Sequence, residues 1–308
     1  MINRANTAAL FTPIYDEFML SEYKENDQVC PILYQSIDDK TKDYKADDMS
    51  GFGIWEEATE GEGGGYEDPT LGYPKTFTQG KQWKKFQVTF EAVDQDEYAL
   101  LKKEGTARSL GRGSRARIET DAATVLTGGF ATAGPDGEYL YDTDHPRNRE
   151  QTDSDLESDN LLTGAFSHDN LELAETQIAN NYVDPTGIPI PQPAKAYIVH
   201  PPAIRGKIKR VLSDRAGEQP DTALRNINRF AGAYDSIEWV YIDSARGGSD
   251  TQWHIIFPEM DYLKIVWSAR PHFTSWIDED AELYKFKGRM LYALGASNWR
   301  FGFGSTGL

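Results

Sequence analysis

The sequence is poor in the residues that support covalent and metal chemistry. Among 308 residues there is one cysteine, Cys30, so no disulfide can form within the chain. A chain without disulfides suits a reducing compartment. The histidines stand at positions 145, 168, 200, 254 and 272, and no two have the spacing of a helical metal site. We therefore expect neither a disulfide framework nor a helical zinc site.

Long apolar runs and basic charge are also lacking. No stretch is apolar over the length of a bilayer, and residues 1–6 lack the basic-then-apolar order of a signal peptide. We expect a soluble cytoplasmic product without a membrane partner. The net charge is −17, from 49 acidic and 32 basic residues. Since phosphate binding relies on Lys and Arg displacing counterions, such a chain is a poor general binder of phosphate backbones, and any nucleic acid near it would be enclosed rather than gripped. The favoured interpretation of the acidic charge by itself is solubility.

The composition of the sequence is that of a globular protein. The hydrophobic fraction of 39% and the aromatic fraction of 12% are high enough to build one or two cores in a chain of this length. No segment repeats at a fixed period, which excludes a solenoid. Four parts are distinguished: 1–48, 49–92, 93–133 together with 281–308, and 134–280.

Residues 1–48 have too little apolar content to fold alone. Their apolar residues at 10–19 lie on one helical face, and a polar stretch with mixed charge follows from Ser21. This composition predicts an arm whose burial partner lies elsewhere, on another chain; an ordinary flexible terminus is the alternative.

Residues 49–92 are interpreted as a long hairpin. Phe86, Val88 and Phe90 alternate with polar residues, which indicates a strand, and the opposing strand is placed at Phe52–Trp55. The glycine-rich stretch at 60–69 lacks the Lys-Ser or Lys-Thr of a phosphate loop. Charge is sorted along the hairpin, and these residues are the candidate contacts between subunits: Glu56, Glu57, Glu60, Glu62, Glu67, Asp68, Lys75, Lys81, Lys84 and Lys85.

Residues 93–133 are predicted to be mostly helical. Asp94 is assigned as the N-cap, and Gly105, Gly111 and Gly113 predict a helix that is bent or broken in two. The arginines between residues 108 and 117 are expected to pair with carboxylates.

Residues 134–280 show mixed α and β character. Ser167 is predicted to cap a helix with Leu171, Ala174 and Ile178 on its inner face. A strand at 196–200, a second helix opened by Pro201 and Pro202, and strands at 237–242, 253–257 and 263–267 follow. Residues 281–308 show alternating strand patterns and an aromatic tail.

Asp142, Asp144 and His145 are the best candidates for a metal site, against the favoured interpretation of a polar turn before Pro146. The acidic run at 153–159 lacks the glycine and closing glutamate of a calcium loop. There is no nucleophile elbow and no dinucleotide-binding glycine motif. We therefore predict no catalytic, cofactor-binding or metal-binding residues and no enzymatic activity.

Four ordered stretches carry a resemblance: the strand and helix start at 85–96, the turn at 136–146, the helix entry at 161–169, and the run at 193–202 with Tyr234-Asp235 and Trp253–Ile256 after it. In this order they resemble the Hong Kong 97-like capsid fold of tailed bacteriophages, most nearly the Mu-like major head subunit. The resemblance implies an α+β fold with an N-terminal arm (1–48), an extended β-hairpin loop (49–92), a peripheral domain with a long spine helix (93–133 and 281–308) and a mixed α/β axial domain (134–280).

The resemblance further implies a structural subunit that assembles with itself into pentamers and hexamers of an icosahedral shell. This shell would form in the host cytoplasm and enclose double-stranded DNA in the virion. Scaffold, portal and decoration proteins are further partners of such families, and no cofactor is implied. Two alternatives stay open: an encapsulin-type compartment shell, and a metal-dependent hydrolase that uses Asp144 and His145.

Overall fold

The computed structural model describes residues 28–47, 51–55, 57, 66, 68–70, 72–94, 105–151, 156–191, 193, 195–213 and 228–308. Within them, the helices are α2 (Cys30–Leu33), α3 (Phe90–Asp94), α4 (Gly105–Thr127), α5 (His168–Asn181) and α6 (Arg205–Val211). The strands are β1 (Gln35–Asp38), β2 (Asp43–Ala46), β3 (Lys75–Thr78), β4 (Gly80–Thr89), β5 (Leu161–Leu162), β6 (Tyr197–His200), β7 (Asp235–Glu238), β8 (Trp253–Ile256), β9 (Leu263–Asp278), β10 (Leu283–Ala296) and β11 (Gly302–Ser305).

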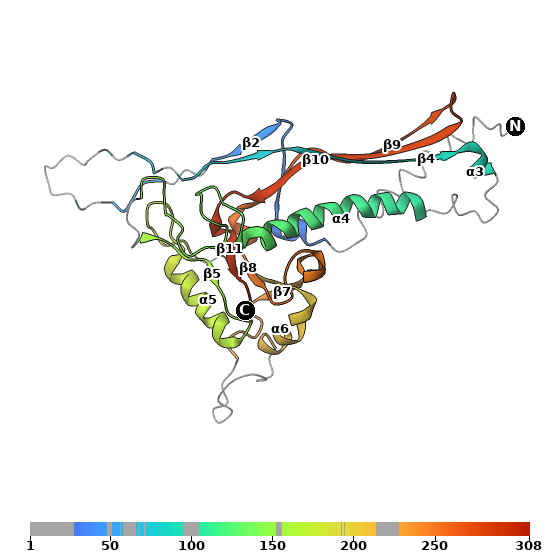
Figure 1. The fold of residues 1–308 in the computed structure, drawn as a ribbon. Coiled ribbons are helices and arrows are strands. Elements are labelled where there is room, and N and C mark those ends of the chain that lie inside the picture. The colour runs from blue at the N-terminus through green and yellow to red at the C-terminus, as the bar shows by residue number, and fades with distance from the viewer. Residues whose placement is uncertain are drawn as a thin grey trace.

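A long four-stranded sheet extends along one side of the molecule, with α4 beneath it (Figure 1). Its strand order is β1-β9-β10-β4, with β1 parallel to β9 and β10 antiparallel to both of its neighbours. Phe86 of β4 stacks on Phe286 of β10, with ring centroids 4.5 Å apart. These two rings and Leu110 of α4 belong to one apolar cluster, so β4 and β10 pack on the helix at this point.

Helix α4 is continuous from Gly105 to Thr127, so of the two predicted alternatives, a bend or a break, a break at Gly111 or Gly113 is wrong. Ile118, Ala122 and Leu126 recur every four residues along one face and are buried in the main core with residues of β9 and β10. The proposed cap is also wrong, because Asp94 is the last residue of α3. Of the predicted arginine pairs, Arg117 lies 3.0 Å from the Asp121 carboxylate.

A second sheet, of order β5-β11-β8-β6-β7, lies at the other end of α4, where α5 and α6 flank it (Figure 1). The predicted cap of α5 is confirmed, since the Ser167 hydroxyl accepts a hydrogen bond from the Asn170 N–H at 3.1 Å. Leu171, Ala174 and Ile178 are buried, as their spacing predicts. Helices and sheets are thus segregated as an α+β fold, and that expectation is confirmed.

The hairpin is paired differently from the prediction. Strand β4 pairs along its length with β10, whereas Phe52–Trp55 contains no strand. The apolar face of β4 needs a partner with matching aromatic residues, and β10 supplies them. The antiparallel pair that flanks the segment between residues 47 and 74 is instead β2 with β3. Beyond this pair, the Thr70 N–H donates to the Gly51 carbonyl at 3.4 Å.

The described part of the predicted arm is packed on its own chain. Cys30, Leu33 and Tyr34 are buried in the main core, and β1 extends the long sheet. An intermolecular partner is therefore not needed for residues 28–47, while residues 1–27 lie outside the described residues. Burial raises the pKa of the Cys30 thiol, which disfavours a thiolate there.

Both sheets draw on residues from either side of the boundary predicted at residue 280. Strand β9 lies with β10 in the long sheet, and β11 returns to pair with β8 in the smaller one. The two sheets are consequently linked by continuous chain near the carboxyl end. In the parts of the chain that the structure describes, no helix has the length and apolarity of a membrane span.

Candidate functional site

The predicted contact lysines lie on two strands. Lys75 begins β3, while Lys81, Lys84 and Lys85 are exposed on β4, the edge strand of the long sheet. Of the acidic candidates, Glu57 and Asp68 fall within the described residues and are exposed. The remaining candidates, Glu56, Glu60, Glu62 and Glu67, lie outside the described residues.

The face of the sheet turned away from α4 carries a basic patch, which we call the basic face: Lys81, Trp83, Lys85, Lys287 and Arg289. Across β4 and β10, Lys85 stands opposite Lys287 and Trp83 opposite Arg289. The Lys85 ammonium lies 4.5 Å from the centroid of the Trp83 ring, a cation–π contact. Desolvation, and then the charges of Lys85, Lys81 and Arg289, lower the pKa of Lys287. Like charges therefore crowd a surface that suits an acidic partner.

The sequence analysis did not identify Lys287 and Arg289 as part of the basic face. A signal was present, because Lys285, Lys287 and Arg289 alternate with other residues as on one face of a strand. What the sequence lacked was the pairing of β10 with β4, which places both strands' cations on the same face.

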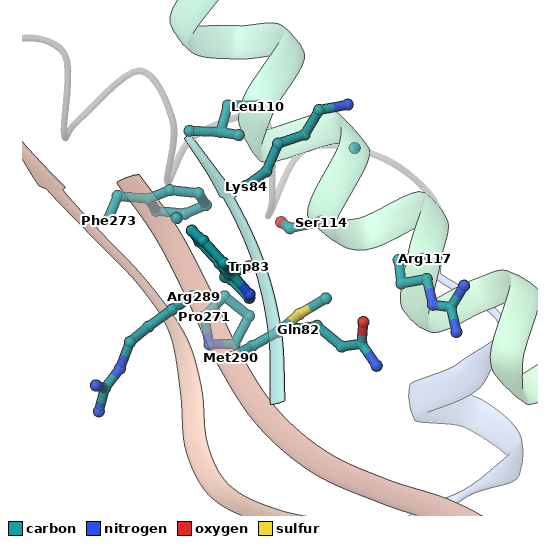
Figure 2. A pocket seen from close by; sticks show the side chains of 12 residues that line it. Gln82, Trp83, Lys84, Leu110, Ser114, Arg117, Pro271, Phe273, Arg289 and Met290 are labelled. Carbon is teal, nitrogen blue, oxygen red and sulfur yellow. The ribbon is translucent and has the colours of Figure 1, made fainter. Parts of the chain in front are cut away.

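Beneath the same strands, α4 and the sheet leave a cleft of about 210 Å³ (Figure 2). Its walls are mainly apolar, with polar and charged groups at the edges. The residues around the cleft are Gln82, Lys84, Leu110, Gly113, Ser114, Arg117, Pro271, Phe273, Gly288 and Met290, together with Trp83 and Arg289, which belong to the basic face and border the cleft from the strands.

The segment between β2 and β3 presents large apolar side chains to solvent. Ile54 is 80% exposed and Trp55 is 93% exposed, and Phe52 and Tyr66 are exposed as well. Acidic residues follow immediately in the sequence, at Glu56 and Glu57. A loop that exposes aromatic side chains beside carboxylates is typical of an interaction segment, because these side chains are removed from water only when a partner surface covers them.

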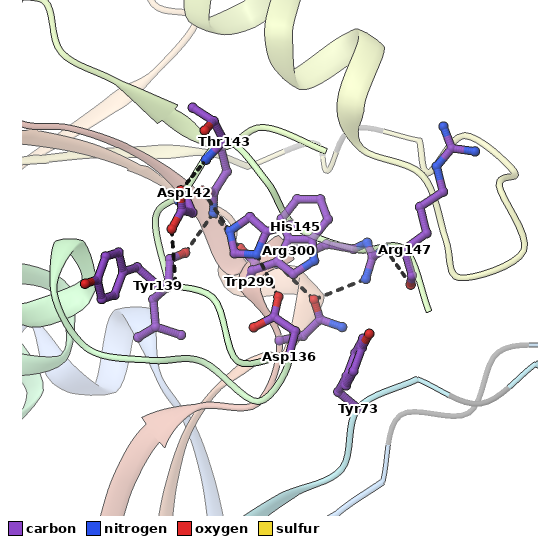
Figure 3. A network of polar contacts seen from close by, with 12 residues as sticks. Tyr73, Asp136, Tyr139, Asp142, Thr143, His145, Arg147, Trp299 and Arg300 are labelled. Atoms are coloured by element: carbon purple, nitrogen blue, oxygen red, sulfur yellow. Dashed lines mark hydrogen bonds and ion pairs between the residues drawn. The ribbon is translucent and has the colours of Figure 1, made fainter. Parts of the chain in front are cut away.

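The candidate metal residues do not converge. His145 is fully buried, its Nδ1 lies 2.7 Å from an Asp136 carboxylate oxygen, and its ring stacks on Trp299 at 4.6 Å (Figure 3). Asp144 is exposed and accepts a hydrogen bond from the Thr143 hydroxyl at 2.7 Å. Within the described residues no three His, Cys, Asp or Glu side chains form a group able to hold a metal.

The network around His145 has a structural role. The Asn160 carbonyl oxygen lies 3.2 Å from His145 Nε2 and accepts the Asp142 N–H at 2.9 Å, while its amide nitrogen donates to the Leu140 carbonyl. The Arg300 guanidinium donates to the Val183 carbonyl at 2.6 Å. These contacts tie the turn at 136–145 to the chain's carboxyl end (Figure 3). Buried polar groups that bind one another and the backbone hold these segments in place, and this network accounts for the position of His145.

Several solved capsid structures are similar in fold to most of this chain. The capsid structure of cyanophage P-SCSP1u matches with a TM-score of 0.61 at 10% identity, over 88% of this chain and 85% of that chain. The mature capsid of bacteriophage PhiM1 matches with a TM-score of 0.59 at 14% identity, over 89% and 84%. A virus-like particle from Pyrococcus furiosus matches with 0.55 at 12% identity, over 96% and 99%. These likenesses show the Hong Kong 97-like fold.

Residues 73–304 match the family model described as phage capsid protein, and the chain belongs to that family. No curated protein sequence matches the chain. The expected fold and the expected family are thus confirmed, while the narrower resemblance to Mu-like head subunits stays a prediction.

Proposed function

We propose that this protein is the major capsid subunit of a tailed phage, which assembles as pentamers and hexamers into an icosahedral shell around double-stranded DNA. The family match over residues 73–304 carries this proposal. The subunit acts by forming contacts and not by catalysis, in keeping with the burial of His145 and its contact with Asp136. Assembly in the host cytoplasm, with scaffold, portal or decoration proteins as further partners, is part of the same proposal.

An encapsulin-type compartment is the second candidate. The observation that favours it is the likeness to the Pyrococcus furiosus virus-like particle, which covers nearly all of both chains. Electron microscopy of the purified protein tests both candidates. Closed shells would support them, shells that protect nucleic acid would favour the phage head, and a protein that forms no shells at any salt concentration would contradict both.

We also propose that the charged candidates of residues 49–92 contact neighbouring subunits. The support is electrostatic: the basic face repels itself, and the acidic segment at 56–68 holds matching carboxylates. Each exposed ion pair contributes only about 0–1 kcal/mol, but a shell repeats the contact on every subunit.

Replacing Lys81 and Lys85 by glutamate tests this contact. Both are exposed on an edge strand, so subunit melting should change little, while the critical concentration for assembly should rise most at low salt. The matched control is the same change at Lys40 and Lys42, which are exposed in the turn between β1 and β2. Assembly that responds equally to both pairs of changes would contradict a specific role for the basic face.

A further inference from the structure

Two glycines, Gly113 and Gly288, line the cleft beneath β4. A Cβ added at Gly113 of α4 would meet no atom within 4 Å, so the helix leaves space at that position. A Cβ at Gly288 of β10 would lie 2.9 Å from the Phe273 ring, so the glycine lets this ring pack flat against the strand. Phe273 thus occupies the space at Gly288, while Gly113 leaves room in a hollow between helix and sheet that Phe273 and Met290 line.

Cationic groups stand at the edge of this hollow. In Figure 2 the Lys84 side chain extends along α4 past Leu110, and the Arg117 guanidinium lies on the far side of Ser114. Arg117 forms an ion pair with Asp121 at 3.0 Å. Lys84 is exposed at the surface. An occupant that combines a large apolar side chain with an adjacent carboxylate fits these surroundings.

One segment of the chain has that chemistry. Trp55 is 93% exposed, Ile54 precedes it, and Glu56 and Glu57 follow it directly. In Figure 1 the described residues 51–55 extend past the β2–β3 pair, away from the amino-terminal half of α4 where the cleft lies. A contact between segment and cleft therefore requires two copies of the chain.

We propose that the cleft binds Trp55, with the carboxylates that follow it, from a second copy of this chain. This inference rests on the proposed function, since it assigns the anchor of a contact between capsid subunits. The volume of about 210 Å³ is adequate for the ring, because an apolar cavity of about 150 Å³ already accommodates benzene. Tryptophan seated in a desolvated pocket is among the commonest anchors of protein interfaces.

Filling the cleft from within is the first test. Gly113→Leu places a side chain into open space and favours the helix, so the subunit should fold normally. The matched control is Gly206→Leu on α6, where an added Cβ also meets nothing within 4 Å. We expect Gly113→Leu and Trp55→Ala each to raise the critical concentration for assembly about tenfold or more, equivalent to about 1.4 kcal/mol. The control should leave it unchanged.

Direct binding separates this inference from shell formation. A fluorescent peptide of residues 50–58 is titrated with unassembled subunits and followed by polarisation. We expect saturable binding that is lost with Gly113→Leu subunits, kept with Gly206→Leu subunits, and lost when alanine replaces Trp55 in the peptide. A protein that forms no shells yet binds the peptide this way contradicts the proposed function and supports the cleft assignment.

Cross-linking locates the contact within an assembly. Glu57→Cys combined with Ser114→Cys should give covalent oligomers under oxidation, because a disulfide requires Cα atoms about 4.4–6.8 Å apart. The control pair is Glu57→Cys with Thr124→Cys, on the same helix about 15 Å further along. The proposed occupant would be overturned if the first pair of cysteines gave shells without covalent oligomers, or if both pairs gave equal amounts of oligomer. It would also be overturned if Gly113→Leu weakened assembly and Trp55→Ala did not.

Discussion

Asn160 holds together parts of the chain that are far apart in sequence, and its removal should be costly. Its amide nitrogen donates to the carbonyls of Leu140 at 2.9 Å and Trp299 at 3.2 Å, and its oxygen accepts the Asp142 N–H at 2.9 Å. The residue is fully buried. Asn160→Ala leaves these groups without a partner, and each buried unsatisfied group costs about 1–3 kcal/mol.

With partial relaxation and some entry of water, the sum for Asn160→Ala is roughly 3–6 kcal/mol. That is a large part of the about 5–15 kcal/mol by which a domain is stable. Urea unfolding of unassembled subunits, followed by tryptophan fluorescence, should show a much lower midpoint with an unchanged slope. Asn180→Ala, the same change on an exposed position of α5, should alter stability by less than about 0.5 kcal/mol. A loss below about 1 kcal/mol for Asn160→Ala would refute the reasoning.

Three further predictions concern the stability of the subunit. Burial lowers the pKa of His254 to about 3, so between about pH 6.5 and pH 3 the unfolded chain binds a proton that the folded chain does not. The free energy of unfolding should therefore decrease by up to about 1.4 kcal/mol for each unit by which the pH falls in this range. Urea titrations at several pH values should show that His254→Asn flattens this slope. Gly304→Ala would place a Cβ 2.6 Å from the Tyr141 ring and should cost about 1–3 kcal/mol, whereas Gly206→Ala should leave the melting temperature unchanged or raised. Ser167→Ala removes the cap of α5 and should cost about 1 kcal/mol, which a lower melting temperature would reveal and an unchanged one would contradict.

Elements that depend on local chemistry were predictable. Helix α5 begins after Ser167 and has its predicted buried face, because capping and a period of 3.6 residues are properties of neighbouring residues. Strand β6 and the helix opened by Pro202 likewise lie where their residues place them. A bend or a break was predicted in α4, and the break is wrong because burial of Ile118 and Leu126 in the core offsets the low helix propensity of the glycines.

The exposure of the candidate contact residues was predictable in part, while their role as contacts stays a prediction. Lys81 and Lys85 are exposed as expected, since charged residues on a half-buried strand remain in water. Lys287, Arg289 and the cleft could not be derived, because they depend on which strand pairs with β4 and on where α4 crosses the sheet. Both are contacts between residues far apart in sequence.

The sequence by itself determined the composition of a globular, acidic chain, the periodic faces of its helices and strands, and the order of segments that resembles a capsid subunit. The tertiary structure decided that β4 pairs with β10 and that residues 28–47 pack on their own chain. It also decided that His145 is enclosed with Asp136. The physical reason is that local propensities act over a few residues, whereas pairing and burial are selected by the matching of surfaces that only the folded chain brings together.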